Sequence, residues 1–160
     1  MAELTTLEEK LAEVTGLARA AQEATQKVEG LVDDEDLAGK LQKMREEAEE
    51  TERRCTDVAE NRDGKKTAIL EKAQETKNEA AEMMSTYLGS DSDDLDGFEF
   101  LTMAEAGEVG HWEILGKLNE KAGEAELKEL VDWALPIQER HLHDVRQASL
   151  TLAAVEDPND

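Results

Sequence analysis

The sequence predicts an all-α fold made of long helices that pack into a bundle. Apolar residues recur at steps of three and four along most of the 160 residues, and this spacing places them on one face of an α-helix. Aromatic residues make up only 3% of the chain, and no alternating run of β-branched residues indicates a strand. The length suffices for one domain with its own core, which we place at residues 1–155, followed by a polar tail at residues 156–160.

The first predicted helix follows an unbroken heptad pattern of apolar and small residues over residues 4–32. Thr5 or Thr6 is a suitable capping residue for its start, because Glu8 or Glu9 follows three residues later and can complete a capping box. A short acidic connection leads to the next helical pattern. The two helices should therefore form an antiparallel hairpin.

Four further helices are predicted from the same periodicity. They cover Asp36–Arg62, Lys65–Leu88, Phe98–Glu120 and Glu124–Ala154. The acidic segment at residues 89–97 is interpreted as a solvated loop between the second and third of these helices. Pro136 lies inside the last helix and should kink it, because proline cannot donate the backbone hydrogen bond that the helix needs there.

The strongly acidic composition excludes several classes of function. The chain has 40 acidic and 18 basic residues and a formal net charge of −22 at pH 7. This charge excludes a general nucleic-acid binder, which needs basic side chains for the phosphates, and it disfavours docking on an anionic membrane. With a single cysteine, neither an internal disulfide nor a cysteine-rich zinc site can form. No signal-peptide pattern and no apolar run of membrane-spanning length occurs, so we expect a cytoplasmic protein.

Glu108 and His111 are the first candidate site residues. In the predicted helix Phe98–Glu120 they fall on the apolar stripe one turn apart, and Glu105 lies on its flank. A charged group that faces a core is costly unless it is paired or bound to a metal. A Glu-x-x-His pair on a core-facing helix is the arrangement by which some helix bundles hold metal ions. The alternatives are a buried Glu–His hydrogen-bonded pair, or a helix rotated enough to expose both side chains.

Three further candidates lie on other helices. His141 faces inward on the last helix, and Gln138 precedes it by three residues, which repeats the spacing of the first pair. Glu139 points to the neighbouring face of a straight helix, but a bend at Pro136 can rotate that face inward. Glu47 lies at the edge of the second stripe, beside small residues that leave room for its carboxylate. The alternatives are an ordinary core-edge histidine and a solvated glutamate.

These motifs together resemble the ferritin-like superfamily, and within it the YciE/YciF-type ferritin-like stress proteins. The most specific part is Glu108–Ile114, which is similar to the third bundle helix of that family, where a His-aromatic-Glu run follows a glutamate. The run Glu46–Thr51 resembles the family's carboxylate-rich second helix, and Gln138–His141 resembles its fourth. The likeness covers nearly the whole chain. It implies a ferritin-like antiparallel four-helix bundle with a helical crossover segment, Lys65–Leu88, between the two hairpins.

The resemblance also implies that the protein binds metal ions. Bundles of this kind bind two ions, usually iron or manganese, and carry ferroxidase, peroxidase or catalase-like activities that act in oxidative or osmotic stress. The candidate ligands in this sequence are Glu47, Glu108, His111, Glu139 and His141. Ala18 stands where the first helix of the family has a carboxylate. This departure favours the alternative, a degenerate bundle without metal that acts as an acidic structural or protein-interaction module or as a homodimer.

Overall fold

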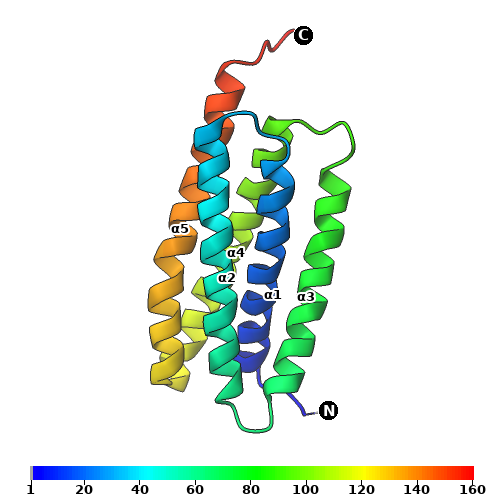
Figure 1. Cartoon of the computed structure of the whole chain (residues 1–160). Helices are drawn as coiled ribbons and strands as arrows, with labels where there is room; N and C mark the ends of the chain where they lie inside the picture. Colours follow the sequence, from blue (N-terminus) through cyan, green and yellow to red (C-terminus); the bar gives the residue numbers. More distant parts are fainter. Residues whose placement is uncertain (1) are drawn as a thin grey trace.

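Five α-helices make up the computed structural model, which describes residues 2–160 (Figure 1). They are α1 (Thr6–Glu29), α2 (Glu35–Glu60), α3 (Lys66–Tyr87), α4 (Asp94–Ala122) and α5 (Ala125–Ala154). Each helix runs antiparallel to the one before it, and residues 2–160 contain no strand. The predicted all-α class is therefore confirmed, as a packed bundle of five helices. Met1, the first residue of the predicted domain, lies outside the described residues.

Four of the helices enclose a common core, and the fifth lies beside them. α1 packs on α2 and α4, and α5 packs on the same two helices, so these four form a closed ring. α3 packs mainly against α1, and its buried residues are Ala68, Ile69 and Ala73. Figure 1 shows α3 on the outer side of α1. The segment between the two hairpins is thus a helix that covers one face of the ring and leads the chain back along its length.

α1 and α3 approach each other closely because Gly16 has no side chain at their contact. A Cβ atom at this position would overlap the carbonyl oxygen of Ala73 and lie 2.7 Å from the Cβ atom of Thr76. Ala73 and the nearby Ile69 of α3 are fully buried there. A larger residue at position 16 would therefore prevent this close approach of α3 to α1.

The core consists of two apolar clusters with a polar layer between them. One cluster surrounds Trp112 and Leu115 in the second half of α4, and the other surrounds Phe98 and Leu101 in its first half. Both clusters draw side chains from all four helices of the ring. The buried polar side chains that α4 and α5 place between the clusters are Glu105, Glu108, Gln138 and His141. We call this set, together with Glu47 of α2, the polar layer.

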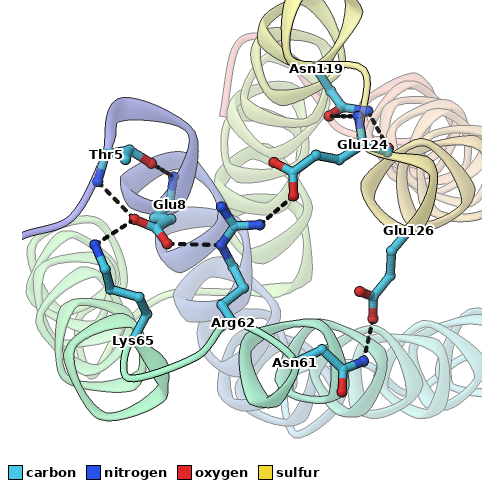
Figure 2. A network of polar contacts seen from close by, with 8 residues as sticks. All are labelled: Thr5, Glu8, Asn61, Arg62, Lys65, Asn119, Glu124 and Glu126. Carbon is cyan, nitrogen blue, oxygen red and sulfur yellow. Dashed lines mark hydrogen bonds and ion pairs between the residues drawn. The ribbon is translucent and has the colours of Figure 1, made fainter.

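Ion pairs tie the start of α1 to two connections at the same end of the bundle (Figure 2). The carboxylate of Glu8 accepts hydrogen bonds from Arg62, at 2.8 Å, and from Lys65, at 3.1 Å. Arg62 also donates to Glu124 in the α4–α5 connection, at 2.6 Å. Thr5 and Glu8 cap each other's backbone N–H groups, which confirms the predicted capping box at the start of this helix. The network therefore joins three segments that are distant in the sequence.

α4 begins earlier than the sequence predicts. Asp93 caps the helix and forms a reciprocal capping box with Asp96, so the end of the acidic segment at residues 89–97 is helical. The helix ends at Gly123, whose φ of 66° is a left-handed conformation that glycine adopts without strain. In the part of the chain that the structure describes, no helix is long and apolar enough to span a membrane.

Candidate functional site

Two carboxyl groups of α4 lie in the polar layer. Glu105 is 1% exposed and Glu108 is 4% exposed. The inward face of α4 runs from Leu101 through these two glutamates to Trp112, in steps of four, three and four. Trp112 is one of the largest fully buried side chains, and burying its large apolar surface keeps this face of the helix turned toward the core. The same rotation of α4 therefore places both carboxyls in the interior.

α5 supplies the groups that contact these carboxyls. With the amide nitrogen of Gln138 directed toward α4, it lies 3.1 Å from Oε2 of Glu105 and 2.9 Å from Oε2 of Glu108. His141, one turn further on, is 2% exposed, and its Nδ1 lies 3.9 Å from Oε2 of Glu105. α5 continues through Pro136 without a break. Gln138 and His141 thus present a buried amide and a buried imidazole on one helical face.

The other ring nitrogen of His141 contacts a carboxylate of α2. His141 Nε2 lies 3.0 Å from Oε1 of Glu47. Arg140 donates two hydrogen bonds to the same carboxylate, one of 2.9 Å to Oε1 and a second to Oε2. If Nε2 carries the ring proton and donates a hydrogen bond to Glu47, the lone pair of Nδ1 faces α4. Glu47 thereby selects the tautomer of this histidine, and the guanidinium of Arg140 holds Glu47 in position.

Burial and neighbouring charges give these groups different proton affinities. Burial raises the pKa of Glu105 to about 8. Burial and the nearby Glu105 carboxyl raise the pKa of Glu108 well above its usual value. Burial would also raise the pKa of Glu47, but hydrogen bonds from Arg140 and His141 outweigh it and lower the pKa. Burial lowers the pKa of His141, although Glu47 opposes this change. At neutral pH the layer therefore holds an ionised Glu47 and a neutral imidazole.

The structure brings together some of the site residues that the sequence predicts. Those that lie in the polar layer are Glu47, Glu108 and His141. The side chain of His111 is 38% exposed, with Nδ1 2.8 Å from the Gly107 carbonyl oxygen and Nε2 3.8 Å from Oε2 of Glu13. Glu139 is exposed on α5, so the proline in this helix does not turn it inward. The expected inward orientation is therefore found for Glu108 but not for His111.

Three residues of the site are indicated weakly or not at all by the sequence pattern. The apolar periodicity predicts Glu105 on the flank of its stripe, yet it is as buried as Glu108. If the buried face of α4 is drawn through Trp112 instead of through His111, it also passes through Glu105. The sequence shows Gln138 three residues before His141, but this spacing does not indicate that its amide contacts both carboxyls of α4. Arg140 shows no signal in the sequence, because its partner Glu47 lies 93 residues away.

The donor set fits one metal ion better than two. Carboxylate oxygens and an imidazole nitrogen are ligands that iron and manganese accept, and Glu105, Glu108 and His141 supply them. A two-metal centre in a helix bundle takes about four carboxylates and two histidines, whereas Ala18, which stands where the resemblance leads us to expect a carboxylate of α1, is a buried alanine. Among residues 2–160, no three His, Cys, Asp or Glu side chains are gathered closely enough to hold an ion as they stand. Binding would therefore require side chains of the polar layer to move.

Comparison with known proteins adds no relative to this description. No model of a protein family matches the sequence, and no curated protein matches it. The ferritin-like resemblance thus remains a prediction from the motifs of the sequence.

Proposed function

We propose that the protein is a ferritin-like metal-binding protein that holds one iron or manganese ion in its polar layer. In this proposal Glu105, Glu108 and His141 bind the ion. The observation that supports it is the burial of two carboxyls beside an imidazole from another helix. Within the described residues, no Lys or Arg forms an ion pair with either carboxyl. A metal ion would supply the positive charge that two buried carboxylates need.

The surroundings of His141 support its role as a ligand. A histidine that binds a metal through one ring nitrogen usually donates the other N–H to a carboxylate, which fixes the orientation of the ring. Here Nε2 lies 3.0 Å from Glu47, and Nδ1 faces the carboxyls of α4. Arg140 holds Glu47 from its other side. In this proposal Glu47 is a positioning residue rather than a ligand.

The polar layer is also suited to controlling the reactivity of an ion. A bound iron or manganese ion supplies the electron-transfer chemistry with oxygen or peroxide that ferroxidase, peroxidase and catalase-like activities need. The apolar clusters around Trp112 and Phe98 lie on either side of the layer, and Glu105 and Glu108 are almost completely buried between them. Burial strengthens the electrostatic attraction between the carboxylates and a cation. A function in oxidative stress follows from this proposal.

The test is a calorimetric titration of the purified protein with Mn²⁺, and with Fe²⁺ under argon. We expect one ion per chain, and at least a tenfold loss of affinity in Glu108→Gln and in His141→Ala. His143→Ala is the matched control, because this histidine is exposed on the same helix, and it should bind as the wild type does. His111→Ala should also bind normally. Absence of binding in the wild type, or a loss confined to His111→Ala, would contradict this site.

The second candidate function is that of a bundle without metal, acting as an acidic structural or protein-interaction module or as a homodimer. It is favoured by the way the polar layer satisfies its own groups. Gln138 contacts both carboxyls of α4, and Arg140 pairs with Glu47. This candidate predicts that neither Mn²⁺ nor Fe²⁺ raises the thermal unfolding midpoint. Analytical ultracentrifugation then tests whether the chain forms dimers.

A further inference from the structure

A pocket of about 200 Å³ lies between α1, α3 and α4. Its walls consist mostly of small and flexible apolar side chains, among them Ala20, Ala80, Ala81, Met83, Met84 and Met103. Met83 and Met103 are 52% and 39% exposed, so they lie where the pocket meets solvent. Methionine side chains adapt their shape to different apolar partners. The pocket is thus an apolar space with an adaptable mouth.

The inner part of the pocket has a different character, because Glu105 and Glu108 also line it. Both side chains are almost completely buried. Among residues 2–160 neither carboxyl has a Lys or Arg partner, and Gln138 contacts them from α5. The exposed side chain of Glu23 adds a further carboxylate to the lining, and it forms an ion pair with Lys77 at 2.6 Å. The half-exposed His111 also lines the pocket. Carboxyl groups and this imidazole are therefore the polar side chains of a space whose walls are otherwise apolar.

We propose that this pocket binds a small aliphatic amine, with the alkyl chain between α1 and α3 and the ammonium group on Glu105 and Glu108. The alkyl chain would bury its surface among the alanines and methionines. The ammonium group would donate hydrogen bonds to the two carboxyl groups, which have no Lys or Arg partner, and its positive charge would favour their ionised form. This binding site shares two residues with the proposed metal site but uses neither His141 nor Glu47.

The size of the pocket limits the ligand. An apolar cavity of about 150 Å³ in another protein accommodates benzene, so a volume of about 200 Å³ suits a ligand of about seven heavy atoms. n-Hexylamine has this size and carries an ammonium group at one end. 1-Hexanol has the same chain without the charge, and hexanoate has the opposite charge. The net charge of −22 further favours a cation over an anion.

The test is a calorimetric titration of the full chain with these three probes. We expect n-hexylamine to bind at one molecule per chain and at least tenfold more tightly than 1-hexanol, and hexanoate not to bind. In Glu108→Gln, which keeps the shape of the side chain but cannot ionise, n-hexylamine should bind no better than 1-hexanol. Equal affinities of the amine and the alcohol for the wild type, or saturable binding of hexanoate, would overturn the proposal.

A second set of variants shows where the amine binds. Ala80→Leu fills the pocket from α3 and should abolish binding, and Ala20→Leu does the same from α1. Ala106→Leu is the matched control, since Ala106 is exposed on α4 and does not line the pocket. If n-hexylamine bound equally well to the two filled variants and to the control, it would be binding to surface carboxylates and the proposal would fail.

The same variants separate this proposal from that of a metal site. Ala80→Leu should lose the amine and keep Mn²⁺, whereas His141→Ala should lose Mn²⁺ and keep the amine. A wild type that binds n-hexylamine but no Mn²⁺ would contradict only the metal site. A wild type that binds Mn²⁺ but none of the three probes would contradict only the amine site.

Discussion

Glu8 and Glu105 are buried to a similar degree, 3% and 1% exposed, yet their pKa values move in opposite directions. Burial disfavours the charged form of both side chains. For Glu8 the Thr5 backbone N–H and the side chains of Arg62 and Lys65 outweigh burial and lower the pKa to about 2. Glu105 has no such donors, and burial raises its pKa to about 8. The partners of a buried carboxyl, rather than burial alone, thus decide whether it stabilises the fold as an anion.

The lowered pKa of Glu8 predicts a contribution to stability that depends on pH. Because the pKa is about 2 in the folded chain and 4.5 for a free glutamate, as in the unfolded chain, the contribution is complete above about pH 4.5 and is lost as the pH falls toward 2. We expect Glu8→Gln to lower the free energy of unfolding at pH 7 by about 2 kcal/mol, and to lose less stability than the wild type on acidification. Urea unfolding between pH 2 and pH 7 measures both effects.

Glu9→Gln is the control for this experiment. Glu9 is exposed in the same turn of α1, and its substitution should change the free energy of unfolding by less than about 0.5 kcal/mol. If Glu8→Gln and the wild type lost stability in parallel from pH 4.5 to pH 2, the ion pairs at this end of the bundle would not be the source of acid sensitivity.

At the scale of elements, the contact between α1 and α3 determines whether the fifth helix stays on the bundle. α3 buries few residues, and its closest approach to α1 is at Gly16. A glycine in the middle of a helix normally costs about 0.5–1 kcal/mol relative to alanine. Its presence here is explained by the carbonyl oxygen of Ala73, which occupies the space of a side chain. The same helix pair forms two walls of the pocket.

This packing predicts opposite effects of two glycine-to-alanine substitutions. Gly16→Ala should destabilise the protein by about 2 kcal/mol, because α3 must move away from α1. Gly110→Ala should stabilise it by about 0.5–1 kcal/mol, because a Cβ atom there meets nothing within 4 Å. Chemical denaturation gives both values, and hydrogen exchange should show lost protection in α3 for Gly16→Ala alone. Equal effects of the two substitutions would show that the close approach is not rigid.

At the scale of the whole molecule, a layer of polar groups interrupts an otherwise apolar core. The clusters around Trp112 and Phe98 each span all four helices of the ring. Burying carboxyls that have no Lys or Arg partner between these clusters costs free energy that an apolar layer would not. A protein selected only for a stable bundle would not need this layer. This cost is a physical reason to expect that the layer binds something.

The cost of the layer predicts that an apolar replacement stabilises the bundle and abolishes binding. The triple variant Glu105→Met, Glu108→Met and Gln138→Met keeps the side-chain lengths and removes the polar groups. We expect its free energy of unfolding at pH 7 to rise by about 1–4 kcal/mol, and its affinity for Mn²⁺ and n-hexylamine to be lost. Denaturant unfolding and calorimetry test the two parts. A less stable variant would mean that the polar groups contribute to the fold itself.

The sequence by itself determined the helical class, the approximate extent of each helix and the capping box at Thr5. These features depend on local periodicity and on contacts within one turn. The sequence also indicated Glu108 as an inward carboxyl and His141 as an inward imidazole. It could do so because apolar residues three and four positions away mark the buried face of each helix.

Only the tertiary structure decided which neighbours of these residues complete the site. Adjacent positions on a helix differ by about 100°, so an apolar stripe through Glu108 can continue either to His111 or to Trp112. In the folded protein α4 packs against the other helices with Trp112 on its buried face. The pairing of Arg140 with Glu47 joins residues 93 positions apart. The pocket depends on how α3 lies against α1. Such features arise where separate helices meet, and the periodicity within one helix carries no information about them.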